Sequence, residues 1–458
     1  MARPTPLSGF PEWLPDGRLV EQHVLDVLRR TFELHGFAGI ETRAVEPLDQ
    51  LLRKGETSKE VYVLRRLQEE ADAEPDRAST LGLHFDLTVP FARYVLENAG
   101  HLAFPFRRYQ MQKVWRGERP QDGRFREFVQ ADIDVVGAGS LPYHYEVELP
   151  LVMAEALAAL QEIGVPPVRI LVNNRKVAEG FYRGLGLTDV EAVLRSIDKL
   201  DKIGADAVAA LLVAEAGADE AQARACLELA SISGSDETVI DRVRALAGTS
   251  NELLDEGLEE LGALIRAAAV RAPGVVVADL KIARGLDYYT GSVYETVLVG
   301  HEQLGSICSG GRYDTLASDG STTYPGVGLS IGVSRLVSRL IGSGLVTTTR
   351  SRRRCGHGGS RSRWRRPPPS SASRSGTPTA AVSRSCGSWA TTSPPPIRSR
   401  TSARASRSRP TPVPGCRPTP ICGRAWCLLD ARSNTCSYEV CDGTRRSSAR
   451  MTAPHCPG

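Results

Sequence analysis

Residues 107–137 limit the possible folds of this chain more than any other stretch. Two segments of strand-like composition flank a short polar loop, residues 117–126, which contains the turn residues Pro120 and Gly123. Apolar-alternating runs on both sides of such a loop predict an antiparallel β-hairpin. We therefore expect an antiparallel sheet built around this hairpin.

The second segment of the hairpin separates its side chains onto two faces, because successive side chains of a strand alternate. One face is apolar and consists of Val129, Ala131, Ile133 and Val135. The other is polar and consists of Gln130, Asp132 and Asp134. With the arginines that end the first segment and lie in the loop, this polar face could hold a zwitterionic small molecule and a polyphosphate. An ordinary edge hairpin with a solvated outer face is the alternative.

Charge and cysteine content divide the chain near residue 350. Residues 350–458 contain 21 arginines, no lysine and three acids, a balance of +18, and eight of the ten cysteines. Residues 1–349 contain 36 basic and 50 acidic residues, a balance of −14. A body with two thiols has no disulfide framework, and no apolar run reaches membrane-spanning length. We therefore expect a cytoplasmic protein that does not enter a membrane.

Hydrophobic periodicity predicts an α+β domain. Its predicted helices span residues 16–36, with Asp16 as N-cap and Gly36 as stop, 149–163 and 333–341. Its predicted strands span residues 39–45, 166–172, 274–282, 293–299 and 326–332, the third and fourth forming a hairpin, and a Gly-rich turn spans 305–314. Residues 175–273 are rich in Ala, Leu and Glu and predict an inserted helical module, with further core helices as the alternative.

Four further residues are candidates for ligand binding. Asp86 and Thr88 would share a face if their segment is extended, although Asp86 could equally cap a helix that begins near Pro90. Arg284, beside two tyrosines, could stabilise phosphoryl charge, or could be an ordinary surface arginine. Arg335 lies in the first turn of a predicted helix, where a cation is disfavoured by the helix dipole, so a nearby phosphate would explain it.

The periodicity stops beyond about Val346. Residues 347–458 are dominated by Arg, Ser, Pro and Gly and predict a disordered basic tail. A tail of this kind could bind RNA electrostatically. Its many arginines, absence of lysine and abrupt onset fit better with a high-GC coding sequence translated out of frame, after a frameshift near residues 346–352.

Taken in order, the motifs of the body resemble the histidyl-tRNA synthetase family (histidine–tRNA ligases), which belongs to the class II aminoacyl-tRNA synthetases. Residues 16–47 are similar to class II motif 1, the hairpin to motif 2 and residues 326–340 to motif 3. Two sequences resemble signatures of this family, ARGLDYYTGSVYE at residues 283–295 and SGGRYD at residues 309–314. The resemblance implies an antiparallel sheet flanked by helices, a catalytic domain at residues 1–346 interrupted by a helical insertion at 175–273, and a homodimer.

The resemblance also implies the reaction and its residues. L-histidine would be activated with ATP and Mg²⁺ to histidyl-adenylate and transferred to tRNA(His), with the metal carried on the ATP phosphates and no metal site in the protein. The implied catalytic residues are Arg116 and Arg284. The implied histidine-binding residues are Asp86, Thr88, Gln130, Asp134, Tyr288, Tyr289 and Tyr313. The implied ATP-binding residues are Arg116, Glu118, Arg124, Phe128 and Arg335.

The chain departs from the family pattern in two ways. Several members have glutamate where this chain has Asp86 and Asp134, which places it in a subgroup with the shorter acid, closer to eukaryote-type sequences. Members also end in an α/β anticodon-binding domain, whose pattern the tail lacks, so transfer to tRNA would be impaired. The alternatives are a catalytically idle paralogue that regulates histidine biosynthesis, and a class II synthetase for another amino acid such as glycine, proline or threonine.

Overall fold

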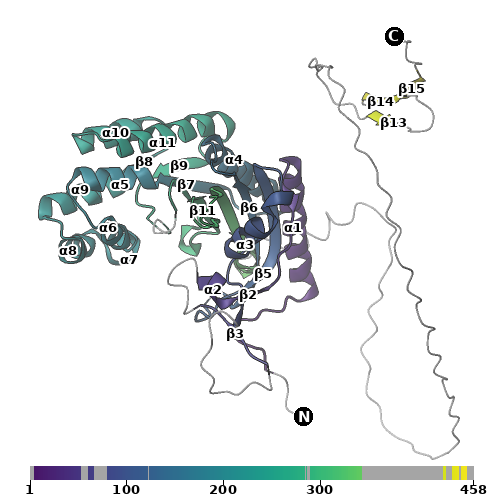
Figure 1. The fold of residues 1–458 in the computed structure, drawn as a ribbon, viewed down its shortest axis with the longest axis horizontal. Helices are drawn as coiled ribbons and strands as arrows, with labels where there is room; N and C mark the ends of the chain where they lie inside the picture. Colours follow the sequence, from purple (N-terminus) through teal and green to yellow (C-terminus); the bar gives the residue numbers. More distant parts are fainter. Residues whose placement is uncertain are drawn as a thin grey trace, which may run out of the picture. The chain divides into compact units, whose positions relative to one another are not determined.

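The computed structural model describes residues 5–52, 60–66, 80–121, 123–283, 285 and 289–342, together with three strands between 427 and 450. The chain divides into two units, Met1–Arg365 and Arg366–Gly458. The first unit contains the sheet and helices drawn in purple to green in Figure 1. Within the described residues, no helix is both long enough and apolar enough to cross a membrane.

A nine-stranded sheet forms the centre of the first unit (Figure 1). In spatial order its strands are β1 (Ala38–Gly39), β5 (Phe106–Trp115), β6 (Glu127–Val136), β12 (Gly326–Gly332), β11 (Cys308–Tyr313), β10 (Ser292–Leu298), β7 (Val168–Asn174), β9 (Val276–Asp279) and β8 (Ser233–Gly234). All neighbours are antiparallel except β1 with β5 and β7 with β9. The predicted central hairpin is confirmed as β5 and β6.

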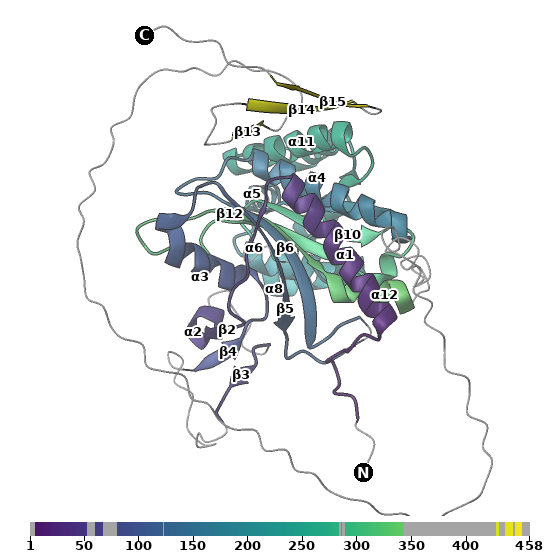
Figure 2. The ribbon, with the colours of Figure 1, turned by 90° about the vertical axis from the view of Figure 1, so that its right-hand side faces the viewer.

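Helices α1 (Pro15–Leu34), α4 (His144–Ala159) and α12 (Val333–Gly342) pack on the apolar face of the sheet. Ala131, Ile133 and Val135 of β6 are completely buried in the core beneath them. Figure 2 shows α1, in purple, crossing the sheet, with α12, in green, near one of its ends. The period-2 pattern of β6 therefore orients the sheet, since its apolar face is the one covered by helices.

Helix α1 ends as predicted but begins differently. Gly36 has a φ of +76° and donates its N–H to the carbonyl of Glu33, so it stops the helix in a conformation that favours glycine. The N-cap, however, is Leu14 and not Asp16. Pro15 is the first helical residue because its fixed φ suits that position and its missing N–H costs nothing there.

The predicted strand at residues 39–45 is instead two short strands in different sheets. β1 pairs with β5, whereas β2 (Val45–Pro47) joins a small sheet of order β2-β4-β3 with β4 (Leu81–Leu83) and β3 (Val63–Leu64). The partner strand decides where each ends, which local composition does not encode. The short helix α2 (Leu48–Leu51) follows β2. After β4 come α3 (Thr88–Asn98) and the 3₁₀ turn η2 (Ala99–His101).

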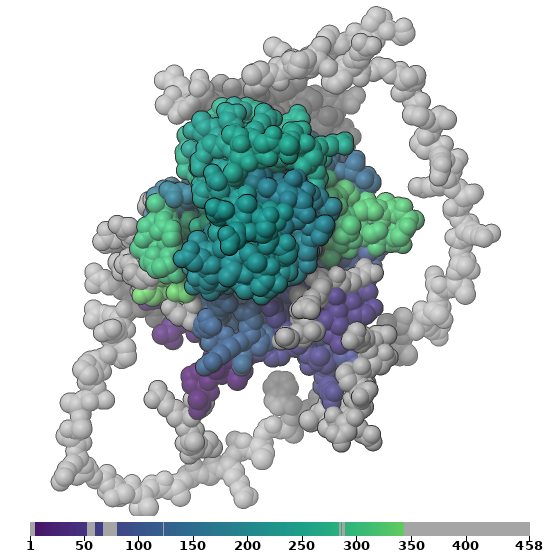
Figure 3. All heavy atoms as spheres, turned by 90° about the vertical axis from the view of Figure 1, so that its left-hand side faces the viewer, coloured from purple at the N-terminus to yellow at the C-terminus, as the bar shows by residue number. Residues whose placement is uncertain are grey.

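The region 175–273 is helical and packs continuously with the sheet. Its helices are α5 (Arg175–Gly184), α6 (Val190–Ile197), α7 (Leu200–Ile203), α8 (Ala205–Ala216), α9 (Glu220–Ala230), α10 (Thr238–Ala247) and α11 (Glu252–Arg271). They gather on the face shown in teal in Figure 3. α11 contacts α5, α4 and β9, and β8 pairs with β9. The helices are thus joined to the sheet, and their status as a separate inserted domain stays a prediction.

Two predictions about the signature regions are wrong. β9 and β10 do not form a hairpin, because β7 lies between them, parallel to β9 and antiparallel to β10. The predicted Gly-rich turn at 305–314 is largely strand β11, preceded by the 3₁₀ turn η4 (Glu302–Leu304). A Cβ on Gly310 would lie 2.0 Å from the carbonyl oxygen of Gly328, so glycine is needed there for close strand approach and not for a turn.

Other boundaries shift by a few residues. α4 begins five residues before the predicted helix and continues into the 3₁₀ turn η3 (Leu160–Ile163). In the second unit the structure describes a three-stranded antiparallel sheet of β13 (Cys427–Leu429), β14 (Cys436–Asp442) and β15 (Arg445–Arg450). These strands depart from the prediction of a disordered tail, the remainder of which falls outside the described residues.

Candidate active site

The polar face of β6 is a buried floor that extends across the neighbouring strands. Gln130, Asp132 and Asp134 are at most 4% exposed, which excludes the alternative of a solvated outer face. On one side they pair in register with Gln112, Gln110 and Arg108 of β5. On the other side they pair with Gly332, Ser330 and Gly328 of β12.

The small residues of β12 make room for two larger polar side chains. A Cβ on Gly328 would lie 2.1 Å from Oδ1 of Asp134, and a Cβ on Gly326 would lie 2.5 Å from the ring of Tyr313. Real side chains do not approach so closely, so glycine is required at both positions for space. The small residues of the strand predicted from GVGLSIG thus leave the space that the side chains of Asp134 and Tyr313 occupy.

Two adjoining cavities open above this floor, one of about 500 Å³ and one of about 20 Å³. The larger is lined by most of the predicted site residues: Asp86, Thr88, Arg116, Glu118, Arg124, Phe128, Gln130, Tyr289 and Arg335. The smaller is lined by Asp134 and Tyr313, together with Thr88 and Tyr289, which line both. The remaining two, Arg284 and Tyr288, lie outside the described residues.

Asp86 supports a helix start while it lines the cavity. Its Oδ1 accepts the backbone N–H of Val89 at 3.0 Å, and the residue is 4% exposed. The expectation of an extended segment is wrong, because Thr88 is the first residue of α3. The start of α3, and not strand alternation, therefore places Asp86 and Thr88 at the same cavity.

Arg116 is held at the cavity wall by neutral oxygens. Its Nε donates to the carbonyl of Phe85 at 3.0 Å, and its Nη2 donates to Oε1 of Gln130 at 3.4 Å. The guanidinium carbon lies 5.2 Å from the ring centre of Phe128. These contacts fix the direction of the guanidinium and leave its charge to act on an anion in the cavity.

Two more arginines reach the larger cavity from different elements. Nη1 of Arg124, in the β5–β6 loop, lies 3.6 Å from Oε2 of Glu118. Nη2 of Arg335, in the first turn of α12, donates to the carbonyl of Leu304 at 3.3 Å. The cavity thus gathers three guanidinium groups, from Arg116 directly after β5, from the β5–β6 loop and from α12, as a polyphosphate site requires.

Burial changes the protonation equilibria of two carboxyl groups at the site. Burial raises the pKa of Asp132, although Arg108 and hydrogen bonds from Ser330 and Gln130 act in the opposite direction. Burial also raises the pKa of Glu60 on the wall of the larger cavity, although the positive charge of Arg116 acts to lower it. Asp132 lines the smaller cavity, so both cavities have a carboxyl group that holds its proton more tightly than usual.

The smaller cavity ends in a tight set of polar contacts. Oδ1 of Asp134 accepts the hydroxyl of Tyr313 at 2.7 Å, and Oδ2 lies 2.7 Å from Nη2 of Arg108. The ring of Tyr289 fits a slot between Gly285 and Gly311, where a Cβ on either glycine would lie 2.7 Å from it. Asp134 and Tyr289 thus both line the same small space.

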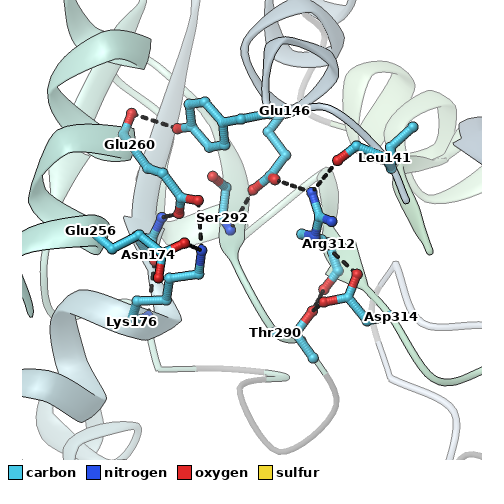
Figure 4. A network of polar contacts seen from close by, with 11 residues as sticks. Leu141, Glu146, Asn174, Lys176, Glu256, Glu260, Thr290, Ser292, Arg312 and Asp314 are labelled. Carbon is cyan, nitrogen blue, oxygen red and sulfur yellow. Dashed lines mark hydrogen bonds and ion pairs between the residues drawn. The ribbon is translucent and has the colours of Figure 1, made fainter. Parts of the chain in front are cut away.

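A partly buried ion-pair network anchors strands β10 and β11 (Figure 4). Glu146 of α4 accepts the backbone N–H of Ser292 at 2.9 Å and pairs with Nη1 of Arg312 at 2.7 Å. Arg312 also pairs with Asp314, which accepts the hydroxyl of Thr290 at 2.6 Å. The network therefore ties the start of β10 to the end of β11 and to α4.

The same region joins the helical module to the sheet (Figure 4). Oε2 of Glu260 in α11 accepts the side-chain amide of Asn174 at 2.8 Å, and its Oε1 pairs with Nζ of Lys176 at 2.6 Å. The hydroxyl of Tyr143 donates to the carbonyl of Glu260 at 2.5 Å. Lys176 also pairs with Glu256 at 2.7 Å.

Sequence reasoning missed two buried charged residues near the site, Arg108 and Glu146. A signal for Arg108 exists in the alternation of Arg108, Gln110 and Gln112 along β5, which repeats the polar pattern of β6. Glu146 is a single acid before an apolar helix, and nothing local distinguishes it. Its role depends on Arg312, which is 166 residues away in sequence.

The fold and the site define a class of protein. A mainly antiparallel sheet with helices on its apolar face, and with arginines and carboxylates around a cavity on its polar face, is that of a class II aminoacyl-tRNA synthetase. The model of the family described as histidyl-tRNA synthetase matches residues 9–336. The chain belongs to the histidyl-tRNA synthetase family, and so to the ligases.

Individual relatives agree with this assignment. A histidine–tRNA ligase of Micrococcus luteus is 65% identical over 359 residues, which cover 77% of this chain and 78% of the relative. One of Cutibacterium acnes is 60% identical over 352 residues, covering 77% of each. The crystal structure of histidyl-tRNA synthetase from Nostoc superimposes with a TM-score of 0.67 at 38% identity, covering 76% of this chain and 77% of that one.

Proposed function

We propose that this chain is a histidine–tRNA ligase, which activates L-histidine with ATP to histidyl-adenylate and then transfers histidine to tRNA(His). The observation that carries the proposal is the pair of adjoining cavities, which brings three arginines and the buried Asp134 to one polar floor. The names of relatives at 55–65% identity favour a ligase over a regulatory paralogue or a synthetase for another amino acid.

The first step is the attack of the histidine carboxylate on the α-phosphorus of ATP, which forms the acyl–phosphate bond of histidyl-adenylate and breaks the α–β phosphoanhydride bond, so that pyrophosphate leaves. Two anions must meet, so fixed positive charge both positions them and stabilises the transition state, and no protein nucleophile is required. Arg116 would bind the α-phosphate, and Arg284 would stabilise it as the carboxylate attacks. Mg²⁺ would enter on the phosphate oxygens of ATP and neutralise further charge there.

The ATP subsite lies along the β5–β6 loop and α12. Phe128 would stack on the adenine, beside Arg116, whose guanidinium it already faces. Glu118 would accept a hydrogen bond from the amino group of adenine. Arg124 and Arg335 would bind the outer phosphates, which accounts for the unfavourable place of Arg335 in the first turn of its helix.

The histidine subsite lies deeper, over β6. Asp86, Thr88 and Gln130 would bind the α-amino group, since all three line the larger cavity. Asp134 would accept a hydrogen bond from an imidazole N–H inside the smaller one. A buried acceptor rejects amino acids that lack the matching donor, because it would remain unpaired. Tyr288, Tyr289 and Tyr313 would complete the pocket.

The proposal extends to partners and to the tail. The chain would act as a homodimer through the region similar to motif 1, and the helical module would approach the acceptor arm of the tRNA. The two cysteines of the described body, Cys226 and Cys308, are buried free thiols, which suits a reducing cytoplasm. We attribute the tail to a frameshift near residues 346–352, and the DNA read in the other frames should encode a periodic, globular continuation. If neither frame does, that attribution is wrong.

Amino-acid-dependent exchange of pyrophosphate into ATP tests the proposed reaction. We expect exchange with histidine and none above background with glycine, proline or threonine. Exchange with another amino acid would identify a different synthetase. No exchange from a folded protein would support the regulatory alternative.

A further inference from the structure

A completely buried arginine lies directly beside the carboxylate proposed to accept the imidazole. Arg108 of β5 is 0% exposed and is the in-register cross-strand partner of Asp134 on β6. Its Nη2 lies 2.7 Å from Oδ2 of Asp134 and 4.0 Å from the carboxylate of Asp132. A charge is rarely buried unless it is paired, because its desolvation is costly.

The guanidinium of Arg108 is held from several sides. Nη1 donates to Oε1 of Gln110 at 3.3 Å, and Nη2 donates to the carbonyl of Leu87, before α3, at 3.4 Å. Its central carbon lies 4.3 Å from the ring centre of Phe91. Contacts from β5 and from the start of α3 therefore fix where its charge is applied.

The two oxygens of Asp134 are oriented by different strands. Oδ1 accepts from Tyr313 of β11 and Oδ2 forms an ion pair with Arg108 of β5, while Gly328 of β12 leaves the space that the carboxylate occupies. A carboxylate oxygen has two lone pairs, so each can accept a second donor. A ring N–H that enters the smaller cavity can thus donate a hydrogen bond to a carboxylate whose orientation is already fixed.

The charges around Asp134 explain why a cation is needed. Asp132 lies on the same strand and lines the same cavity, and Asp86 before α3 is close enough to interact electrostatically with Asp132. Without a cation, burial and these neighbouring acids would favour the protonated form of Asp134, and its proton would face the N–H donor of the substrate.

We propose that Arg108 is a positioning residue for histidine specificity, which keeps Asp134 ionised and directed into the smaller cavity so that it accepts the imidazole N–H. This inference rests on the proposed function. The short side chain of Asp134 contributes to this arrangement, because its single methylene group keeps the carboxylate close to the sheet, within reach of Arg108 on the neighbouring strand.

Three variants test this role in the histidine-dependent exchange assay. Arg108→Met removes the charge and keeps an apolar stem, and Arg108→Lys restores a charge. Arg107→Met is the matched control, because Arg107 is the adjacent residue of the same strand but pairs with Glu148. We expect Arg108→Met to raise the KM for histidine about tenfold or more, with the KM for ATP changed less than about twofold. Arg108→Lys should recover much of the loss, and Arg107→Met should leave both KM values unchanged.

The pH profile separates this role from simple packing. The ratio of the histidine KM of Arg108→Met to that of the wild type should grow as the pH falls from 8 to 6, because the carboxyl that has lost its cation takes up a proton. A flat ratio, or equal increases in both KM values, would overturn the inference. If Arg108→Met does not fold, Arg108→Gln, which also lacks the charge, takes its place, and a flat ratio for that variant would count against the proposal.

The double variant shows whether Arg108 acts through Asp134. In an Asp134→Asn background, Arg108→Met should change the histidine KM by less than about twofold, whereas independent roles would give the full single-variant effect again. Failure of the proposed function is distinct, because the wild type itself would then show no exchange with histidine. The inference itself fails if the wild type is active and Arg108→Met still has its full effect in the Asp134→Asn background.

Discussion

At the scale of single residues, the site depends on side chains whose types follow from the chemistry. Strand alternation predicted the polar face of Gln130 and Asp134, because a strand exposes every second residue to one side. It did not predict that Arg108 lies beside Asp134 on that face, since cross-strand register is set by the turn and the partner strand. Glu146 was beyond local prediction, as its partner Arg312 is remote in sequence.

Asp134→Ala should raise the KM for histidine roughly a hundredfold, because the imidazole N–H loses its acceptor and Arg108 loses its partner. The KM for ATP should change only a few-fold. Exchange kinetics with each substrate varied in turn measure both. Similar increases in the two KM values would remove Asp134 from the histidine pocket.

Phe128→Ala is the reciprocal variant and serves as the control. Loss of an aromatic ring stacked on a base costs about 1–3 kcal/mol, so the KM for ATP should rise by roughly tenfold or more. The KM for histidine should stay close to the wild-type value. A variant that changed the histidine KM instead would place the adenine elsewhere.

At the scale of elements, the strands were predictable where composition and period agreed, as in β5, β6 and β12. The hairpin of β9 and β10 was wrong because the strand between them, β7, comes from a segment more than a hundred residues earlier. The glycines of β11 were misassigned to a turn because sequence does not distinguish a glycine needed for a turn from one needed for close approach.

Gly328→Ala should abolish most histidine activation while the fold persists. The added Cβ would lie 2.1 Å from Oδ1 of Asp134, and that carboxylate would have to leave its position between Arg108 and Tyr313. Gly100→Ala is the control, since nothing lies within 4 Å of its added Cβ. Circular dichroism reports the fold and exchange reports activity. Equal activity of the two variants would contradict this account of β12.

The contact between β5 and α4 should make stability depend on pH. A hydrogen-bonded pair with Arg107 holds the pKa of Glu148 below its usual value, so the pair stabilises the fold above the ordinary glutamate pKa and is lost as the pH falls through the lowered one. At pH 7, Glu148→Gln should lower the free energy of unfolding by about 1 kcal/mol, a value reduced for partial exposure.

Urea denaturation of both proteins at a series of pH values measures this contribution. The difference should shrink as the pH falls below about 4.3, where glutamate becomes protonated in the unfolded chain. Asp26→Asn removes an exposed ion pair with Arg29 and should have little effect at any pH. A difference that does not vary with pH would assign the effect of Glu148→Gln to packing.

At the scale of the whole molecule, the body could be predicted from the sequence much further than the tail. The order of motifs along the body predicted one catalytic unit, and the sheet assembles them from segments as distant as Asp86 and Arg335. The tail has no periodicity from which a core could be predicted, and the short strands β13, β14 and β15 were not foreseen. We propose that activation of histidine needs only the body, whereas transfer to tRNA would be impaired because the tail lacks the pattern of an anticodon-binding domain.

The most direct test is to measure enzyme-bound histidyl-adenylate after the purified chain is mixed with histidine, ATP and Mg²⁺ in the absence of tRNA. Acid quenching and chromatography give the amount of adenylate per chain. We predict close to one adenylate per chain for the wild type and almost none for Arg116→Ala, which lacks the guanidinium proposed to bind the α-phosphate. A folded wild-type protein that forms no adenylate would contradict the central claim that the polar floor of this sheet activates histidine.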